Sequence, residues 1–212
     1  MKVGIIDYGS GNLASVARAL EVVGASPFLV NHPTDLPSCD ALILPGVGSF
    51  AECSALLNKD GWTTALRDEV LGKDRFLLGL CVGMQILADS STEGAAPDDT
   101  VPGLGLIPGQ VKHLTDLGCT NRVPHVGWNG IFRGQNEDPL IKNIPDGTDF
   151  YFVHSYAFVA ECADDISATT DYGIPLTAAV HRGHIWGTQF HPEKSSRAGF
   201  QLLRDFIEAV KC

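Results

Sequence analysis

Residues 76–87 read FLLGLCVGMQIL, in which an apolar run leads to a cysteine between two glycines and then to a second apolar stretch. The run before Cys81 has the length and composition of a buried strand. Gly79 and Gly83 stand two residues before and after the cysteine, where the absence of a side chain permits a tight turn. The segment therefore predicts a strand, a sharp turn and a helix starting at Val82. Such a turn raises Cys81 to the carboxyl edge of a sheet, where ligands bind in α/β folds.

The neighbouring stretches extend this pattern through the first half of the chain. Apolar runs at 3–6, 28–30 and 41–46 (VGII, FLV, ALILPG) predict parallel strands that are buried on both faces. Residues 13–23 and 56–70 have the apolar spacing of helices between those strands. This alternation of strands and helices indicates an α/β fold with a mostly parallel central sheet covered by helices on both sides.

The second half of the chain has a different texture. A polar, Pro-rich loop, AAPDDTVPG, precedes strand-like stretches at 123–132, 149–159, 166–173 and 176–190 that have no long helices between them. They predict an antiparallel or mixed extension of the sheet. The final segment, 196–210, places its apolar residues on one helical face that should pack on the sheet. We expect a single domain over residues 1–212.

Composition narrows the class of protein. The net charge of -10 and the pI near 5.0 argue against a broad nucleic-acid surface. The N-terminus carries too few apolar residues before a charge for a secretory core or a membrane span. No CxxC pair and no zinc-type Cys–His spacing occurs among the six cysteines, so we expect no metal site, no cofactor and free thiols in the cytoplasm. We assign no chemistry to five of them: Cys39, Cys53, Cys119, Cys162 and Cys212.

Cys81 is the candidate nucleophile, because helix N-terminal amides aimed at its sulfur favour the thiolate. The alternative is a small buried side chain, the role of most free cysteines. His191, in GTQFHPEKSS, is the candidate base, and Pro192 forces a bend that turns Glu193 back toward the imidazole. The competing histidines, each a structural or solvated residue when taken alone, are His32, His113, His125, His154, His181 and His184.

Oxyanion stabilisation requires two amides directed at one point. Val82 follows the nucleophile and can supply one of them. The loop after the strand ALIL contains Val47 and Gly48, and its glycines permit a peptide flip that exposes a second amide. The alternative for this loop is an ordinary turn at the end of a strand.

The motifs PGVGSF, GLCVGMQ and FHPEKS, in this order and with these gaps, together resemble the triad-type (class I) glutamine amidotransferases over nearly the whole chain. Three further stretches, DYGSGN at 7–12, PHVGWN at 124–129 and YFVHSY at 151–156, are similar to the glutaminase subunits of imidazole glycerol phosphate synthase. The resemblance implies a flavodoxin-like fold, glutamine hydrolysis by Cys81, His191 and Glu193, and transfer of ammonia to a (β/α)8 barrel synthase (cyclase) subunit in histidine biosynthesis. The chain ends soon after its last helix, so we expect that partner as a separate chain in a heterodimer.

The resemblance also implies roles for further residues. Val82, Val47 and Gly48 take the oxyanion positions. The glutamine contacts fall on Gln85, Glu93, Ser155 and Tyr156, and the positions that face the synthase are Asn12, Trp128, Tyr151 and Lys194. Taken alone, the two aromatic residues of the second set could equally be core residues.

Several other functions also fit parts of the sequence. The same chemistry could serve synthases for anthranilate, guanylate or pyridoxal phosphate, although PHVGWN and YFVHSY argue against these. A flavodoxin-like cysteine peptidase would not need the glutamine contacts. A non-catalytic module could use the Gly-rich loops to bind a phosphate or a flavin.

Overall fold

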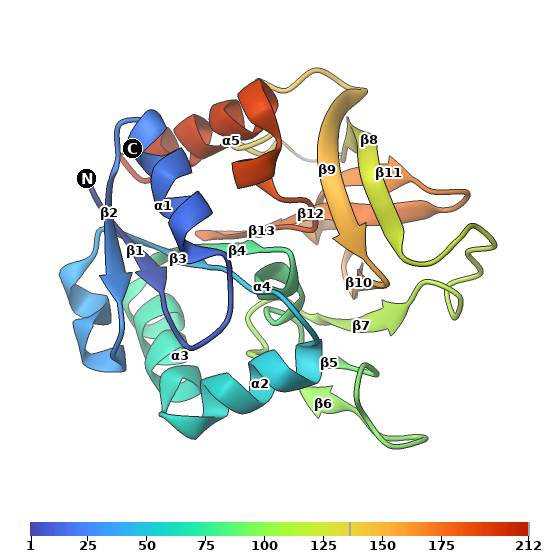
Figure 1. Ribbon diagram of the computed structural model, residues 1–212, viewed down its shortest axis with the longest axis horizontal. Coiled ribbons are helices and arrows are strands. Elements are labelled where there is room, and N and C mark those ends of the chain that lie inside the picture. Colours follow the sequence, from blue (N-terminus) through green and yellow to red (C-terminus); the bar gives the residue numbers. More distant parts are fainter. Residues whose placement is uncertain (136, 212) are drawn as a thin grey trace.

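The structure is a computed structural model that describes residues 1–135 and 137–211. Within these residues a nine-stranded sheet has the order β2-β1-β3-β4-β13-β12-β11-β8-β9 (Figure 1). Pairing is parallel from β2 to β13 and antiparallel from β13 to β9, as expected for the two halves of the chain. The strand bounds in that order are Ser26–Val30, Lys2–Ile6, Ala41–Leu44, Phe76–Leu80, Ile185–Thr188, Pro175–Arg182, Ile166–Asp171, His125–Arg133 and Thr148–His154.

A four-stranded sheet, in the order β10-β7-β5-β6, lies beside the first among the described residues. Its strands are Tyr156–Ala160, Gly109–His113, Ser90–Ser91 and Val101–Pro102. The helices α1 to α5 span Leu13–Val22, Phe50–Lys59, Trp62–Lys73, Val82–Gln85 and Ser196–Ala209. Three 3-10 helices, η1 to η3, span Pro33–Ser38, Ala163–Asp165 and Pro192–Lys194.

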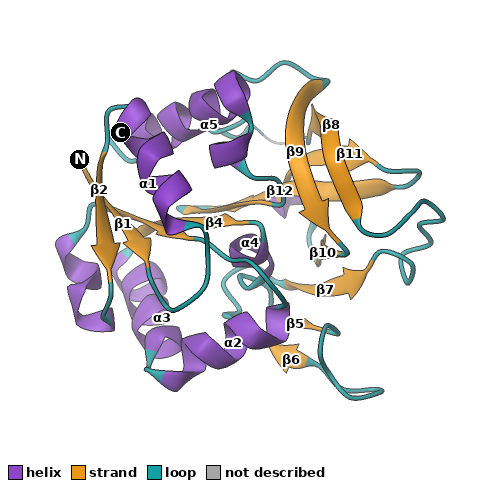
Figure 2. Ribbon diagram, viewed as in Figure 1, coloured by secondary structure: helices purple, strands orange, loops and turns teal. Residues whose placement is uncertain are grey.

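Helices cover both faces of the parallel part of the large sheet. Figures 1 and 2 show α1 and α5 on one face and α2 and α3 on the other. In β3, Ala41 and Ile43 belong to the apolar cluster of α1 and α5, whereas Leu42 and Leu44 belong to that of α2 and α3. All four side chains are buried, which explains why this strand is a continuous apolar run.

Two sequence-based expectations for this half were wrong. Phe28 and Leu29 in β2 are 37% and 44% exposed, because β2 is the end strand of the sheet and has a neighbour on one side only. The single helical segment expected at 56–70 divides into α2 and α3. Gly61 interrupts it with a left-handed backbone (φ 78°), a conformation that glycine adopts without steric cost.

The turn after β4 lies at the carboxyl edge of the parallel strands, as predicted. The amide of Cys81 donates to the carbonyl of Thr188 at the end of β13 (2.8 Å), so Cys81 begins where two neighbouring strands finish. The loop 45–49 leaves β3 at the same edge. The helix expected to start at Val82 does so, but it is only the four-residue α4, so its dipole is a weak source of thiolate stabilisation.

Candidate active site

Cys81 occupies a backbone conformation that side-chain-bearing residues rarely adopt (φ 53°, ψ −112°). Two glycines make this turn possible. A Cβ on Gly79 would come within 2.6 Å of the Gly83 carbonyl oxygen, and a Cβ on Gly83 would overlap the Leu44 carbonyl oxygen. The local backbone is therefore packed so tightly that the cysteine side chain is held in one place, as in the nucleophile turn of many hydrolases.

His191 and Glu193 form a buried pair beside the cysteine. Nδ1 of His191 donates to Oε1 of Glu193 (2.8 Å), because a carboxylate only accepts. This bond leaves Nε2 of the imidazole for the sulfur. Burial lowers the pKa of His191, but hydrogen bonds to Cys81 and Glu193 and the charges of both groups outweigh burial and raise it to about 9. His191 is consequently protonated near neutral pH.

Backbone contacts fix the position of this pair. Pro192 opens η3, so the chain turns directly after His191 and returns Glu193 to the ring. The amide of His191 donates to the carbonyl of Tyr151 in β9 (3.0 Å). Ser195 donates from its hydroxyl to the His191 carbonyl (2.6 Å) and accepts from the Tyr151 amide (3.1 Å). The candidate base is thus tied to β9.

A pocket of about 250 Å³ opens beside the cysteine. This volume is below the roughly 300–1,000 Å³ of pockets for drug-sized ligands, so it suits a molecule as small as one amino acid. The pocket brings together seven of the residues selected from the sequence, which are Gly48, Cys81, Val82, Gln85, Glu93, Ser155 and Tyr156. His191 and Glu193 are not among the residues that line it.

Two of these polar residues are engaged by the protein. Oε2 of Glu93 accepts from the amide of Phe50 at the start of α2 (2.7 Å), and burial is the main cause of the raised pKa of Glu93. Nε2 of Gln85 donates to the Tyr156 carbonyl (3.0 Å) and to Oε1 of Gln189 (2.9 Å). Only Oε1 of Gln85 is left for a ligand.

The backbone of Val47 is held by Ser10 and Cys53. Its amide donates to the Ser10 hydroxyl oxygen (3.2 Å), and its carbonyl accepts from that hydroxyl (2.9 Å) and from the Cys53 thiol (3.5 Å). Val47 lines a separate hollow with Ser10 and Cys53, whereas Gly48 lines the pocket of Cys81. In this structure the Val47 N–H points to Ser10 and does not serve Cys81.

The four residues expected to face a partner lie at the surface near the site. Trp128 on β8 is 54% exposed and its ring packs edge-on against Tyr151 of β9 (6.0 Å between centroids). Asn12 caps α1, accepting from the Ser15 amide, and it is exposed, as is Lys194 in η3. Around Trp128 the outer side of β8 and β9 exposes further apolar side chains, those of Val126, Phe132 and Val153.

Sequence reasoning missed several residues that contact the site. Gln189 approaches the cysteine sulfur, Ser10 holds Val47, and His154 lines the pocket and hydrogen-bonds to His125. For His125 and His154 a signal was present, since both stand in quoted motifs. Ser10 and Gln189 also stand in quoted motifs, DYGSGN and GTQFHPEKSS, but nothing in those motifs indicates their contacts, which join segments far apart in the chain.

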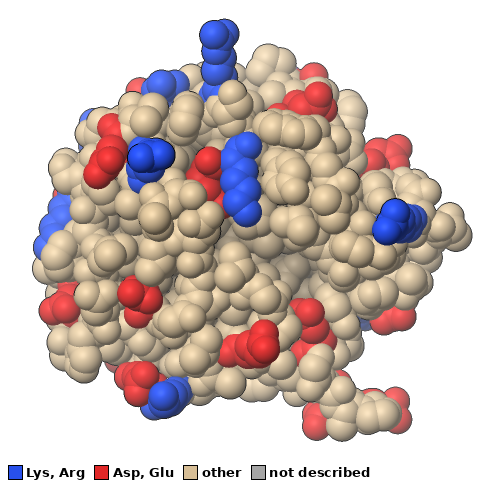
Figure 3. Space-filling model, in the orientation of Figure 1, with Lys and Arg blue, Asp and Glu red and all other residues tan. Residues whose placement is uncertain are grey.

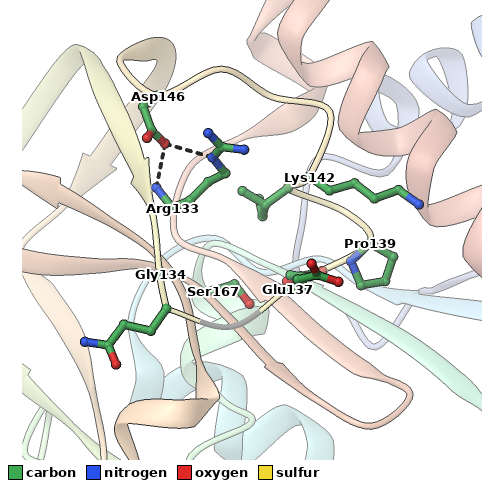
Figure 4. Close-up of a pocket in the computed structure, with 10 residues that line it drawn as sticks. Arg133, Gly134, Glu137, Pro139, Lys142, Asp146 and Ser167 are labelled. Atoms are coloured by element: carbon green, nitrogen blue, oxygen red, sulfur yellow. Dashed lines mark hydrogen bonds and ion pairs between the residues drawn. The ribbon is translucent and has the colours of Figure 1, made fainter.

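The largest hollow among the described cavities, about 630 Å³, is elsewhere. It has the exposed Arg133–Asp146 ion pair at its rim and shares no lining residue with the Cys81 pocket (Figure 4). Val126 pairs with Val153, whose carbonyl lies 4.0 Å from the Cys81 sulfur. Arg133 is seven residues further along β8, about 23 Å at the rise of an extended strand.

Other kinds of site find little support in the described part of the chain. No group of three or more His, Cys, Asp or Glu side chains there is placed to hold a metal ion. No helix over these residues has the length and apolar character needed to cross a membrane. On the face shown in Figure 3, Lys and Arg side chains are scattered among Asp and Glu side chains and form no basic patch.

Comparison with known proteins identifies the family of this chain. The family model described as "Glutamine amidotransferase class-I" matches residues 4–210. The "Imidazole glycerol phosphate synthase subunit HisH" of Acinetobacter baylyi is 42% identical over 207 residues, covering 98% of each chain. The subunit of the same name from Moorella thermoacetica is 43% identical over 209 residues, covering 99% of this chain and 95% of its own.

Solved structures match the fold. One described as a glutamine amidotransferase superposes with a TM-score of 0.75 at 21% identity and covers 99% of both chains. The PurLQS structure from Thermotoga maritima superposes with a TM-score of 0.75 at 16% identity and covers 98% of both chains. At such low identity these two likenesses concern the fold alone.

Proposed function

The chain belongs to the class-I glutamine amidotransferases, and from that membership we propose that it is the glutaminase subunit of an imidazole glycerol phosphate synthase. In this role it hydrolyses glutamine to glutamate and ammonia. The ammonia passes to a (β/α)8 synthase subunit, bound as a heterodimer, which forms imidazole glycerol phosphate and aminoimidazole carboxamide ribotide in histidine biosynthesis.

One observation carries the chemical part of this proposal. Cys81 stands on a strained turn beside the buried His191–Glu193 pair, at the base of a pocket that suits one amino acid. The raised pKa of His191, about 9, means that the imidazole keeps its proton at neutral pH next to Cys81 and Glu193. A thiolate paired with an imidazolium is ready both to attack a carbonyl and to protonate a leaving group.

The proposed reaction has two halves. The Cys81 thiolate attacks the side-chain amide carbon of glutamine, and His191 gives its proton to the departing nitrogen, which leaves as ammonia. The product is a γ-glutamyl thioester. Water then attacks the thioester while His191 takes its proton, and glutamate leaves with the thiolate restored. Glu193 keeps the imidazole in one tautomer and stabilises its positive form in both halves.

We propose that the oxyanion formed in each half is held by the amide of Val82 and by an amide of the 47–48 loop. Because the Val47 N–H donates to Ser10 in this structure, that peptide must turn before its amide can contribute. A single oxyanion donor contributes on the order of 3 kcal/mol to transition-state stabilisation. The isolated chain would then be nearly silent, and the synthase with its substrate bound would favour the turned loop.

The proposed synthase surface is the outer side of β8 and β9 around Trp128 and Tyr151, with Asn12 and Lys194 near it. Exposed apolar side chains at the centre of a patch are typical of interfaces. This surface connects to the catalytic residues, since the Tyr151 carbonyl accepts from the amide of His191. Binding of the synthase to this surface can therefore shift His191 through β9.

The test is to follow glutamate and imidazole glycerol phosphate together, with and without a barrel synthase subunit and its ribotide substrate. We expect one glutamate for each imidazole glycerol phosphate in the complex, and much slower glutamate release by the isolated chain. Glutamate release that the synthase neither accelerates nor couples to ring formation would contradict the proposed partner. A chain that releases no glutamate under any condition would contradict the proposed chemistry.

A further inference from the structure

A line of hydrogen-bonded polar groups, buried except at its outer end, runs from β8 to the nucleophile. It consists of the side chains of Asn129, His125, His154, Gln85 and Gln189 together with the carbonyl of Tyr156, and is called the relay below. We infer that Gln189 is a further catalytic residue that donates an N–H to the Cys81 sulfur and favours its thiolate, and that the relay fixes its amide in this orientation. The inference rests on the proposed function of Cys81.

Gln189 contacts the sulfur of Cys81 directly. Nε2 of Gln189 lies 3.8 Å from Sγ of Cys81, within the range of hydrogen bonds to sulfur. The Gln189 side chain is fully buried, so no water competes for it. A thiolate is a better acceptor than a thiol, and hydrogen bonds to charged groups are stronger than those between neutral groups. A donor at this position therefore favours the charged form of the nucleophile.

The hydrogen bonds of Gln85 determine which end of the Gln189 amide faces the sulfur. Gln85 contacts the Tyr156 carbonyl, which only accepts, so the Gln85 atom at that contact is its nitrogen. The same nitrogen donates to Gln189 (2.9 Å), which requires the Gln189 oxygen on that side. The nitrogen of Gln189 is left for Cys81. A reversed amide would place two donors against each other at one end.

The relay continues from the Tyr156 carbonyl to two histidines. The Tyr156 carbonyl also accepts from Nδ1 of His154 (2.8 Å), so that nitrogen carries the proton and Nε2 of the ring is an acceptor. His125 donates to this Nε2 from its own Nδ1 (3.0 Å). Asn129, whose amide nitrogen also donates to the Asp171 carbonyl (2.8 Å), donates to Nε2 of His125 (3.3 Å). Every link has one donor and one acceptor if both rings are neutral.

Burial supports that neutral state. Desolvation lowers the pKa of His125 to about 4, and it is also the main cause of the pKa of about 4 for His154. Both rings remain uncharged in the pH range where the enzyme would work. His125 and His154 are thus positioning residues, which act on the nucleophile only through the Tyr156 carbonyl and the two glutamines.

Several titratable groups surround Cys81 and influence its reactivity at any pH. His191 and Glu193 come from the segment after β13, and His154 comes from β9. Tyr8 follows β1, and Glu93 lines the pocket. A change at Gln189 removes a neutral donor and leaves all of these in place, so its effect on the thiolate can be measured separately.

The first test measures alkylation of Cys81 by iodoacetamide as a function of pH, read by mass spectrometry on the peptide that contains it. Gln189→Leu and Gln189→Met both remove the donor with little change in volume. Loss of one hydrogen bond to a charged group should move the midpoint of the profile up by about one pH unit, with roughly tenfold slower alkylation below it. Equal midpoints in the wild type and in whichever variant folds would overturn the inference.

The second test uses a matched pair at His125. An asparagine amide branches where Nδ1 stands, so His125→Asn can still donate to His154. A glutamine amide reaches only the position of Nε2, so His125→Gln keeps a group toward Asn129 and loses the donor. We expect a midpoint close to wild type for His125→Asn and a shift in the direction of the Gln189 variants for His125→Gln. If the two His125 variants have the same alkylation midpoint and equal melting temperatures, the histidines do not belong to the relay.

These tests do not require glutamine, so they separate the two proposals. A shifted midpoint in a protein that never releases glutamate with its synthase would support the relay and refute the proposed function. Normal glutamate release by the complex, together with Gln189 variants that keep the wild-type alkylation midpoint, would support the proposed function and refute the relay.

Discussion

Replacing Ser10 with alanine should raise the glutaminase activity of the isolated chain. The Ser10 hydroxyl holds the backbone of Val47 through two hydrogen bonds, one accepted from its amide (3.2 Å) and one donated to its carbonyl (2.9 Å). These two groups belong to the peptides on either side of Val47. In the proposed mechanism the peptide that carries the Val47 N–H must turn before the loop can stabilise the oxyanion. Ser10→Ala therefore destabilises the resting arrangement without altering any group that contacts glutamine.

The size of the effect follows from these two contacts. A neutral hydrogen bond contributes about 0.5–1.5 kcal/mol net, and partial exposure of Ser10 places both bonds toward the lower end. Together they contribute about 1–2 kcal/mol, which changes a two-state equilibrium by about 5–30-fold. If the turned loop is a minor state in the isolated chain, glutamate release should rise by the same factor.

The assay is glutamate release by the isolated chain and by the complex with its synthase and ribotide. The activated complex should change by less than about twofold, because the partner already favours the turned loop. Ser10→Thr keeps the hydroxyl and should behave like the wild type. Cys53→Ala removes only the longer thiol contacts, to the Val47 carbonyl and to the Ser10 hydroxyl (both 3.5 Å), and should have a smaller effect. An isolated Ser10→Ala chain that is no faster than the wild type would refute the role of this loop contact.

Three further predictions concern other parts of the molecule. Glu193→Gln removes the charge beside His191, whose pKa is about 9. The alkaline limb of the kcat/KM profile should therefore move from near pH 9 to a pH lower by about one unit or more. An unmoved limb would exclude His191 as the group that titrates there. Burial is the main cause of the raised pKa of Asp205, whose Oδ2 has no hydrogen-bond partner among the described residues. A carboxyl group whose pKa is raised in the folded state stabilises the fold below its unfolded-state pKa, and this stability is lost as the pH rises through its folded-state pKa. Asp205→Asn should therefore raise the melting temperature at pH 7 and have little effect near pH 3. Trp128→Ala should weaken synthase binding by at least about tenfold in titration calorimetry, as expected for a central aromatic residue of an interface. Phe28→Ala, at the opposite edge of the sheet, should leave the affinity unchanged. Equal affinities of the two variants would place the interface elsewhere.

The site could be predicted where its constraints are local in sequence. The close approach of Gly79 to Gly83 and the turn imposed by Pro192 are properties of neighbouring residues, so Cys81, His191 and Glu193 could be selected before the fold was known. The family resemblance selected most of the pocket in the same way, because its motifs are short and contiguous. The strand order then brought those motifs to one edge of the sheet.

The remaining features depend on contacts between distant segments. FLV at 28–30 looks like a buried strand, yet Phe28 and Leu29 are exposed because no strand lies beyond β2 in the sheet. The division of α2 from α3 had a local signal in Asp60-Gly61, but the shortness of α4 did not. Gln189 lies 108 residues from Cys81 in sequence, and Ser10 lies 37 residues from Val47, so neither contact can be read from a motif.

The central claim is that Cys81 of this chain releases the nitrogen that the synthase uses. The most direct measurement is the formation of imidazole glycerol phosphate by the complex that carries Cys81→Ala, with glutamine or with ammonium salt as the nitrogen source. We predict that glutamine no longer supports the reaction, whereas ammonium supports it as well as in the wild-type complex. Formation of imidazole glycerol phosphate from glutamine by this variant would contradict the assignment of Cys81 as the nucleophile.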